Sequence, residues 1–416
     1  MRILIMSKSG DALGIAHRMV LEGNQVKMFI EDTRYADAGK GLVERVAAWR
    51  PHVLKSDLVM CDMVGFGRYE ETLEKFGKPV LMCNKFADMA ELDRGKGMEL
   101  FDKFGIETPE TFIFNTPKEA LDLLAVWEDP GFVIKPFGNI DTGKTYVIEN
   151  QRDYEWALST YKDNQKLLVQ RTVEGIEIST EGWYNGREWI KPFNHTFEEK
   201  RFMSGGVGRN TGCMGNVVIP ASSDSKLVQE TIMLIEPWLK KINYRGCVDI
   251  NTIVNATNAY ALEFTIRIGY DAIEALAEGL MEPLGDFLFE VALGIKKSME
   301  LKPGVFMAVR VSVPPWPMNE PGKDDAGRPI HGINEQALKH LFLTDVKMEN
   351  GEYVYAAGDG VVFKVTAQGS NVKEASNRIN RSLEKVTVHD MQYRDDIGSR
   401  VKGDISQLKA WGWLNE

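Results

Sequence analysis

The sequence predicts a mixed chain that combines an α/β part with α+β parts over several domains. Its 416 residues are enough for roughly two to four domains of ordinary size. Hydrophobic residues make up 44% of the chain and charged residues 26%, which is typical of a globular protein with packed cores. Strands and helices alternate in the first part of the chain, and short strands dominate later parts.

Charge and cysteine content exclude some classes of function. Lys and Arg number 50 and Asp and Glu number 60, so the net charge of −10 argues against nucleic acid as a partner. The cysteines form no C-x-x-C pair, which predicts buried reduced thiols in a cytoplasmic protein. The apolar start is too short for a signal peptide and no run of 18 apolar residues exists, so no membrane partner is expected.

The first 90 residues predict a small α/β domain. A strand, a glycine-containing turn over 7–14, a helix and a second strand give the βαβ pattern of a doubly wound sheet. Ligands of such sheets bind at the carboxyl ends of the strands, where Gly10 and Asp11 are candidate substrate-binding residues. The predicted elements are strands over 1–6, 25–30, 58–60 and 80–82 and helices over 15–22 and 67–76.

The middle of the chain changes its pattern twice. Short strands around one helix predict a compact α+β lobe after a helical stretch over 88–105. A long helix, a hairpin of two strands and an amphipathic helix follow, and a last β-rich segment begins near residue 305. The predicted elements are strands over 131–136, 145–148, 166–171, 176–184, 246–254 and 259–265 and helices over 153–162, 223–242 and 271–294.

Two acids in the predicted hairpin are candidate metal ligands. Asp249 and Glu263 lie in apolar strands, where an unpaired carboxylate would be costly to bury. Facing carboxylates hold a hard cation such as Mg²⁺ through oxygen ligands. The alternative is that both acids are ordinary solvent-facing strand residues.

A second candidate site joins Lys135, in an apolar strand, to a polar loop that ends in Gly143 and Lys144. Glycines let backbone N–H groups approach a phosphate closely, and lysines neutralise its charge. The spacing matches the P-loop pattern G-x-x-x-x-G-K-T. We reject that interpretation because Thr145 begins a strand, whereas a P-loop lysine opens a helix.

The third candidate is the segment 200–215, which contains five glycines and begins with Lys200 and Arg201. We expect a mobile loop that closes over anionic ligands. The alternative is a flexible surface loop without a function.

Taken together, these residues resemble the ATP-grasp superfamily, and specifically the phosphoribosylamine–glycine ligase family. Residues 208–215 are similar to its motif G-P-N-T-G-G-M-G, and 262–269 to its metal-binding E-F-N-x-R-F-G-D. Residues 360–369 and 393–398 match its C-terminal signatures. The resemblance implies a Rossmann-like pre-ATP-grasp domain over 1–90, a two-lobed ATP-grasp fold over 91–300 with a mobile lid lobe over about 110–185, and a small β-rich domain over 301–416.

The resemblance also implies cofactors and roles. ATP and Mg²⁺, or Mn²⁺, would serve a ligase that forms an amide through an acyl phosphate, from a small carboxylate such as glycine and an amine; the family's own reaction belongs to purine biosynthesis. The catalytic residues would be Arg267 and Lys200; the ATP-binding residues Lys96, Lys135, Lys144, Gln170, Arg171, Val173 and Glu177; the substrate-binding residues Gly10, Asp11, Asn210, Thr211 and Gly212; and the metal ligands Asp249, Glu263 and Thr265.

Departures from the family concentrate at the amine site and the metal. The family's opening G-x-G-G-R-E-H, which binds phosphoribosylamine, has neither its arginine nor its histidine in residues 7–13. Asp62 lies in the segment that replaces a G-P-E motif, and Thr265 replaces a metal-binding asparagine. The chain is therefore predicted to use phosphoribosylamine or, as a diverged ligase, a different amine such as a nucleotide or modified base. A non-catalytic ATP-binding protein is the third alternative.

Overall fold

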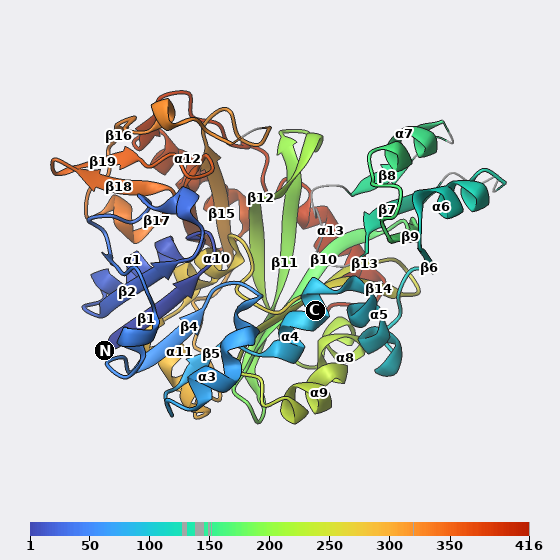
Figure 1. Cartoon of the computed structure of the whole chain (residues 1–416), viewed down its shortest axis with the longest axis horizontal. Coiled ribbons are helices and arrows are strands. Elements are labelled where there is room, and N and C mark those ends of the chain that lie inside the picture. The colour runs from blue at the N-terminus through green and yellow to red at the C-terminus, as the bar shows by residue number, and fades with distance from the viewer. Residues whose placement is uncertain (127–130, 138–144, 149, 151, 319, 416) are drawn as a thin grey trace.

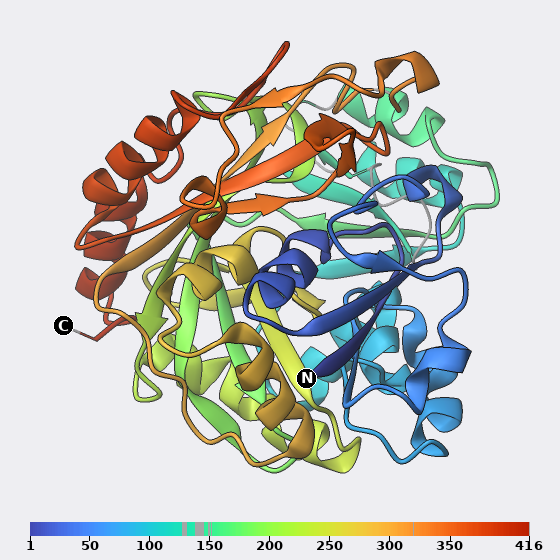
Figure 2. The same cartoon turned by 90° about the vertical axis from the view of Figure 1, so that its left-hand side faces the viewer.

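The computed structural model describes residues 1–126, 131–137, 145–148, 150, 152–318 and 320–415. The prediction of a mixed α/β and α+β chain is confirmed: larger sheets of five, eight and four strands organise the described residues (Figure 1). Figure 2 shows the N-terminal strands and helices in blue beside the C-terminal ones in orange and red. Within the described residues, no helix is long and apolar enough to cross a membrane.

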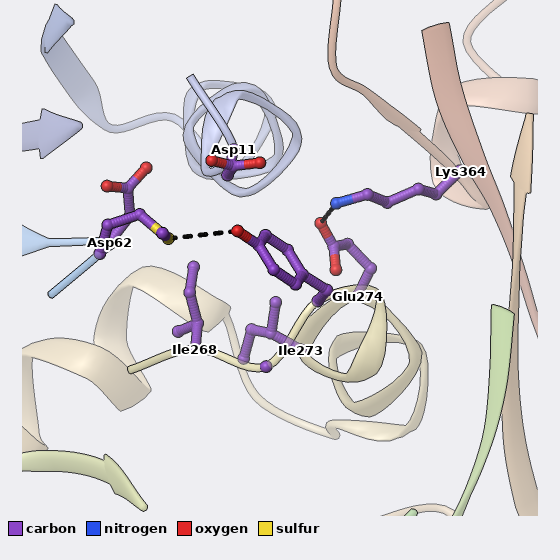
Figure 3. A pocket seen from close by; sticks show the side chains of 9 residues that line it. Asp11, Asp62, Ile268, Ile273, Glu274 and Lys364 are labelled. Carbon is purple, nitrogen blue, oxygen red and sulfur yellow. Dashed lines mark hydrogen bonds and ion pairs between the residues drawn. The ribbon is translucent and has the colours of Figure 1, made fainter. Parts of the chain in front are cut away.

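The N-terminal domain is built on a parallel sheet in the order β3-β2-β1-β4-β5. Strand order reverses between β1 and β4, and ligands of open α/β sheets bind at this switch point. Asp11 follows β1 and Asp62 directly follows β4, so both acids lie at this edge (Figure 3). The elements are β1 (Arg2–Ser7), α1 (Leu13–Leu21), β2 (Gln25–Ile30), β3 (Glu44–Arg45), α2 (Arg50–Val53), β4 (Leu58–Cys61), α3 (Glu70–Glu74) and β5 (Val80–Leu81).

The central sheet is antiparallel, in the order β14-β13-β10-β11-β12-β15-β20-β17. It continues across residue 300, where the sequence suggested a domain boundary, because β12 pairs with β15 and β15 with β20. Its strands are β10 (Ile176–Tyr184), β11 (Trp189–Met203), β12 (Val207–Ala221), β13 (Gly246–Val254), β14 (Ala259–Thr265), β15 (Val305–Ser312), β17 (Leu341–Leu343) and β20 (Val361–Gly369).

The lid lobe comprises the described residues between 111 and 171 and stands to one side of the central sheet (Figure 1). Its antiparallel sheet has the order β6-β9-β7-β8. Strand β10, which the sequence placed in the lid, belongs to the central sheet instead. The lobe contains β6 (Thr111–Phe114), α6 (Pro117–Leu124), β7 (Phe132–Pro136), β8 (Tyr146–Ile148), α7 (Asp153–Ser159) and β9 (Leu167–Arg171).

The remaining elements cover these sheets. Helix α1 packs against β17, where a Cβ on Gly14 would stand 2.8 Å from the Cβ of Phe342, so only glycine permits this approach. Helix α12 packs against β15 and β20. The elements are α4 (Lys85–Leu92), α5 (Arg94–Lys103), α8 (Lys226–Glu230), α9 (Glu236–Lys241), α10 (Ala272–Gly279), α11 (Leu284–Leu293), β16 (Ile330–His331), β18 (Val346–Glu349), β19 (Glu352–Tyr355), α12 (Val372–Leu383), β21 (Thr387–Val388) and α13 (Val401–Ala410).

Three predicted helices are wrong in length. The stretch 223–242 contains α8, a 3₁₀ turn and α9, because Pro237 lacks an N–H and starts a new helix. The stretch 271–294 is divided into α10 and α11 at Pro283. The stretch 88–105 is divided at Asp93, whose side chain accepts hydrogen bonds from the first backbone N–H groups of α5.

The expected mobile loop over 200–215 is also wrong, because these residues form the end of a long hairpin. Strands β11 and β12 pair along this segment and turn at Gly205 and Gly206, whose φ angles are +80° and +69°. The Ser204 hydroxyl donates to Asp395 at 2.6 Å, and the Gly205 N–H donates to Asp396 at 2.8 Å. The glycines therefore serve a tight turn, and backbone pairing orders the rest.

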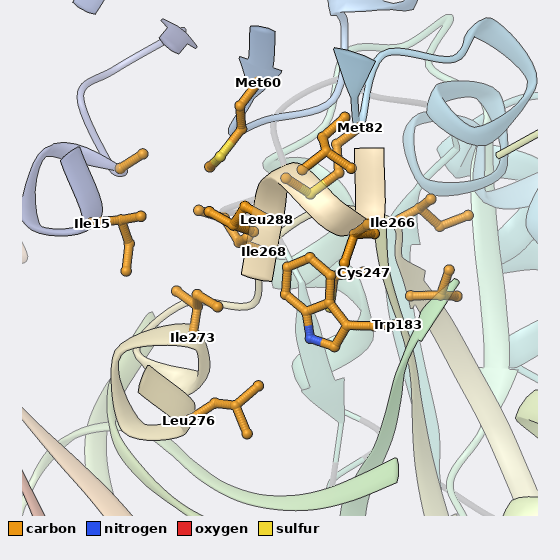
Figure 4. Close-up of a cluster of buried hydrophobic side chains, with 14 of the residues drawn as sticks. Ile15, Met60, Met82, Trp183, Cys247, Ile266, Ile268, Ile273, Leu276 and Leu288 are labelled. Carbon is orange, nitrogen blue, oxygen red and sulfur yellow. The ribbon is translucent and has the colours of Figure 1, made fainter. Parts of the chain in front are cut away.

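A shared hydrophobic core joins the N-terminal domain to the central sheet. Figure 4 shows Met60 and Met82 of the N-terminal domain close to Trp183 of the central sheet and Leu288 of α11. The lid lobe has a separate core, formed by residues such as Phe132 and Val169. The N-terminal domain is thus fixed to the central sheet by buried side chains.

Candidate active site

One face of the central sheet gathers the polar residues that the sequence singled out. Side chains alternate between the two faces of a strand, so the pairing of neighbouring strands decides which of them meet. The residues on this face are Glu177, Ser179 and Glu181 of β10; Asn194, Glu198 and Lys200 of β11; Asn216 of β12; Asp249 and Asn251 of β13; and Glu263 and Thr265 of β14.

The hairpin of β13 and β14 brings its acids to this face. Asp249 lies opposite Thr265, and Asn251 lies opposite Glu263. The two carboxylates are therefore diagonal neighbours, which are typically about 7–8 Å apart in an antiparallel pair. Asp249 is buried, whereas Glu263 is open to solvent at the edge of the face. The sequence missed Asn251, although its spacing from Asp249 already places both on one face.

In the buried part of the face, burial disfavours the charged form of two carboxylates more than their neighbours favour it. Burial raises the pKa of Asp249 well above its usual value, and Glu181 and Glu198 raise it further. Burial also raises the pKa of Glu181 to about 7. Among the described residues, Glu181 Oε1 and Asn251 Oδ1 are buried without a hydrogen-bond partner. Unpaired oxygens of this kind suit a cation.

Two lysines reach this region from different lobes. Lys200 Nζ donates to Glu177 Oε1 at 2.7 Å on the central sheet. Lys135 Nζ donates to Gln170 Oε1 at 3.0 Å in the lid lobe. Although the Glu263 side chain is exposed, the surrounding lobes shield its carboxylate from part of the solvent, which would raise its pKa. The charges of Lys200, Lys135 and Arg94 outweigh this effect and hold the pKa below its usual value. Cations of both lobes therefore act on one carboxylate.

Arg94 is a member of this group that the sequence did not indicate. It opens α5, and its guanidinium donates to the backbone oxygen of Pro136 at 2.9 Å in the lid lobe. In the sequence, Arg94 is simply the first residue after the N-cap Asp93 of a helix. Nothing in this pattern distinguishes it from an ordinary surface arginine.

Two of the predicted nucleotide contacts, Lys96 and Arg171, pair with other side chains. Lys96 is not close to Lys135 and Lys200. Its ammonium pairs with Glu99 at 2.7 Å, and its side chain lines a surface groove together with Trp238. Arg171 pairs with Glu110 at 3.1 Å. Val173 lies in the segment that leads from β9 of the lid sheet to β10 of the central sheet. Lys144 lies outside the described residues.

Arg267 lies at the other end of the site, next to the N-terminal domain. Its Nε donates to Glu91 Oε1 at 3.0 Å, and its guanidinium carbon is 4.3 Å from the centroid of the Tyr270 ring. A Cβ on Gly212 would be 3.6 Å from the same ring. Tyr270 therefore connects Arg267 to the hairpin strand that carries the predicted carboxylate-binding residues.

Asn210 and Thr211 are the other two predicted residues of that strand. Asn210 is exposed and lies opposite Arg201. The Thr211 hydroxyl donates to the backbone oxygen of Lys200 at 2.9 Å. A ligand bound by the exposed side chain of Asn210 would thus lie near the base of the β11–β12 turn.

Of the two predicted substrate residues in the N-terminal domain, Asp11 borders a small cavity next to Tyr270. Asp11 lines it together with Asp62, which the sequence noted as a departure without assigning it a role. Gly10 is buried in the preceding turn, where its φ of +87° requires glycine and its N–H donates to Ser7 Oγ at 2.7 Å. Figure 3 shows Asp11 and Asp62 on the side of the cavity opposite Ile268 and Ile273.

The fold and this site define an ATP-grasp ligase. The ATP-grasp domain model of phosphoribosylglycinamide synthetase matches residues 97–272, and the C-domain model of the same enzyme matches residues 317–400. The chain belongs to the ATP-grasp superfamily and, within it, resembles the phosphoribosylglycinamide synthetases.

Individual relatives agree with these family models. Phosphoribosylamine–glycine ligase of Streptomyces coelicolor is 27% identical over 334 residues, which are 76% of this chain and 78% of that protein. The enzyme of the same name from Archaeoglobus fulgidus is 21% identical and covers 96% of this chain and 100% of its own length.

Solved structures show the same fold. Phosphoribosylamine–glycine ligase from Thermotoga maritima superposes with a TM-score of 0.74 at 21% identity, covering 95% of this chain and 100% of that one. Biotin carboxylase from Campylobacter jejuni superposes with a TM-score of 0.66 at 14% identity, covering 98% and 96%. At these identities the likeness establishes the fold.

Proposed function

We propose that the protein is an ATP-dependent ligase that joins a small carboxylate, such as glycine or another amino acid, to an amine through an acyl phosphate. One observation carries the proposal: Glu177 holds Lys200 on the central sheet at 2.7 Å, Gln170 holds Lys135 in the lid lobe at 3.0 Å, and the charges of both lysines lower the pKa of Glu263. Such an arrangement suits a phosphate chain held between two lobes, with charge supplied from both sides.

The nucleotide would lie between the lid lobe and the central sheet. Lys135 and Lys200 would neutralise its phosphate oxygens, with Arg94 as a further cation. The segment around Val173 would face the adenine through its backbone, and Glu177 the ribose. Transfer of the terminal phosphoryl group to the substrate carboxylate gives ADP and an acyl phosphate, and attack by the amine then forms the amide and releases phosphate.

The residues of the hairpin fit a magnesium ion. In the part of the chain that the structure describes, no three His, Cys, Asp or Glu side chains come together as a metal site. Mg²⁺ commonly takes one or two carboxylates and completes its coordination with phosphate and water. Asp249 and Glu263 would supply these carboxylates, with Thr265 or the unpaired oxygen of Asn251 as a neutral donor. When bound, the ion would neutralise phosphate charge during transfer.

Arg267 and the hairpin residues would serve the carboxylate. Arg267 would orient the acyl phosphate, and Glu91 fixes its guanidinium for this task. Asn210, Thr211 and Gly212 would contact the amino-acid substrate. Phosphoribosylamine and a different amine both remain candidates for the nucleophile at this level of the proposal.

Hydroxylamine trapping tests the proposed function without knowledge of the amine. An acyl phosphate reacts with hydroxylamine to form a hydroxamate, which is detected by its coloured iron complex. We expect hydroxamate and ADP in equal amounts with ATP, Mg²⁺ and one member of a panel of the twenty amino acids. Absence of hydroxamate with every amino acid, for a folded protein that binds ATP, would contradict the ligase.

Nucleotide affinity is expected to fall as the pH rises above about 8. Burial lowers the pKa of Lys135 to about 8, although Glu263 opposes this shift. The lysine is charged below that pH and loses its attraction for phosphate above it, so the Kd for ATP should rise by up to about tenfold per pH unit. Calorimetry between pH 7 and pH 9 measures this effect.

Lys135→Met is the matched variant for this measurement. It should bind ATP weakly at pH 7 and show a flatter pH dependence than the parent, because the titrating group is gone. Equal slopes in parent and variant would exclude Lys135 as the group responsible.

A further inference from the structure

A small cavity lies at the switch point of the N-terminal sheet, between that domain and the start of α10. Its volume is about 10 Å³, which is room for roughly one water-sized group. We call it the carboxylate-lined cavity. Its lining residues are Asp11, Asp62, Met63, Ile268, Gly269, Tyr270, Ile273, Glu274 and Lys364.

Two buried carboxylates in this lining each have an oxygen without a partner. Asp62 is fully buried; its Oδ2 accepts from the Ser7 hydroxyl at 2.5 Å and from the Ala12 N–H at 3.1 Å. Glu274 is 1% exposed, and its Oε1 accepts from Lys364 at 2.5 Å. Asp62 Oδ1 and Glu274 Oε2 have no hydrogen-bond partner among the described residues. A buried carboxylate oxygen left unpaired is costly unless a ligand donates to it.

The cations around the cavity are already engaged. Lys364 lies 2.5 Å from Glu274 and 3.4 Å from Asp271 (Figure 3). Arg310 forms a two-pronged ion pair with Asp271, at 2.7 and 3.0 Å. Arg310 and Lys364 thus form ion pairs with Asp271 and Glu274. Among the described residues, no ion pair is formed by Asp11 or Asp62.

The titration of the neighbouring acids reflects this excess. Burial, followed by the charge of Asp11, raises the pKa of Asp62 to about 7. Burial raises the pKa of Asp359 to about 6, and Asp11 again contributes. Arg310 lowers the pKa of Asp359, but this cation is already paired with Asp271. Among the residues that the structure describes, the carboxylates around the cavity thus outnumber the cations.

The cavity is also close to the residues assigned to the acyl phosphate. The Tyr270 ring lines the cavity. The guanidinium carbon of Arg267 lies 4.3 Å from the centroid of the same ring. An amine bound in the cavity would therefore stand next to the group that it has to attack.

We infer that the carboxylate-lined cavity binds the primary ammonium group of an alkylamine substrate and rejects an amine that carries a phosphate beside its nitrogen. An ammonium group has the size of a water molecule, and its N–H bonds can donate to carboxylate oxygens such as the unpartnered Asp62 Oδ1 and Glu274 Oε2 of the lining. A phosphate would face those carboxylates without a free cation. The inference rests on the proposed function and specifies its amine.

The bound ammonium becomes a nucleophile by losing a proton. Transfer of one proton to the Asp62 carboxylate leaves a neutral amine and a neutral carboxylic acid. The nitrogen lone pair then forms the bond to the acyl carbon, the bond from that carbon to the phosphate oxygen breaks, and the second proton leaves with the released phosphate.

A pair of amines that differ in one phosphate tests the inference. ADP release is measured with the amino acid that gives hydroxamate and with methylamine, ethanolamine, putrescine, phosphoethanolamine or phosphoribosylamine. At least one unphosphorylated amine should raise ADP release tenfold or more, and phosphoethanolamine should be at least tenfold poorer than ethanolamine. Preference for either phosphorylated amine overturns the inference, as does hydroxamate formation without use of any alkylamine.

Two variants link the preference to the cavity. Asp62→Asn and Asp11→Asn should each raise the KM for the accepted amine at least tenfold more than they change the KM for ATP, and Asp11 serves if the buried Asp62 variant fails to fold. Glu335→Gln, a change of an exposed acid far along the chain, is the control. An amine KM that both cavity variants leave unchanged would overturn the inference. Loss of hydroxamate formation with the parent protein would instead refute the proposed function.

Discussion

Glu263→Gln is expected to lower the rate of ADP formation by a factor of about 10²–10³ while leaving the protein folded. The carboxylate of Glu263 is exposed on the active face, and Lys200 and Lys135 keep its pKa low, so it is charged at neutral pH. The amide has the same shape but no charge with which to bind a magnesium ion. Steady-state ADP release over a range of Mg²⁺ concentrations measures the effect.

The Mg²⁺ dependence separates this role from a structural one. We expect the variant to need a higher Mg²⁺ concentration for its remaining activity, and the Glu335→Gln control to behave like the parent. A rate within twofold of the parent, or a lower rate with an unchanged Mg²⁺ requirement, would contradict the metal-binding role of Glu263.

Asp62→Asn is expected to make the protein more stable at pH 8, by up to about 4 kcal/mol. Burial and the charge of Asp11 raise the pKa of Asp62 in the folded protein from its usual value of 3.8 to about 7. Between these values the folded protein binds more protons than the unfolded chain, so the parent's free energy of unfolding falls as the pH rises through this window. A pKa difference of about three units, at 1.36 kcal/mol per unit, sets the upper limit of this loss of stability. Asparagine carries no charge, so the variant does not lose this stability.

Chemical denaturation of parent and variant at pH 5 and pH 8 checks this sign. The advantage of Asp62→Asn should be larger at pH 8, where the parent's carboxylate is charged in the folded state. Glu335→Gln, a substitution of an exposed side chain, is the control and should stay within about 0.5 kcal/mol of the parent at both pH values. A parent that is equally stable or more stable than the Asp62 variant at pH 8 would show that a favourable contact already compensates the buried charge.

The active face was partly predictable because a strand has a simple period. Asp249 and Glu263 lie in apolar strands joined by a turn of polar residues, and this pattern placed both acids on one hairpin. The same alternation includes Asn251, which the sequence interpretation omitted. Lys135 and Lys200 were candidates from their local sequence, and the resemblance gave their roles. Nothing in the local pattern of either lysine shows that two lobes bring them together.

The helices were less predictable, although two of the errors had signals. Pro237 and Pro283 lie inside the stretches that were read as continuous helices, and each marks a new helix start. The glycines of 200–215 were read as loop residues, but Gly205 and Gly206 suffice for the turn and the rest pairs in strands. A count of glycines alone does not distinguish these cases.

The carboxylate-lined cavity could not be predicted from sequence patterns. Asp11, Asp62, Glu274 and Lys364 come from four distant segments, and only the packing of the N-terminal domain onto α10 brings them together. Residues 61–63, which replace the family's G-P-E motif, indicated that the amine site differs from that of the family. They did not show whether a ligand there would need a positive or a negative charge.

The lid lobe has a hydrophobic core of its own, so it can rotate more easily than the N-terminal domain. The buried apolar side chains of the lid lobe pack among themselves, while those of the N-terminal domain interlock with the central sheet. Rotation of the lid lobe about the segment 172–175 would expose little apolar surface, whereas displacement of the N-terminal domain would open a shared core. Closure over a nucleotide between the lobes would therefore be a hinge movement that leaves the proposed amine site and Arg267 in one rigid frame.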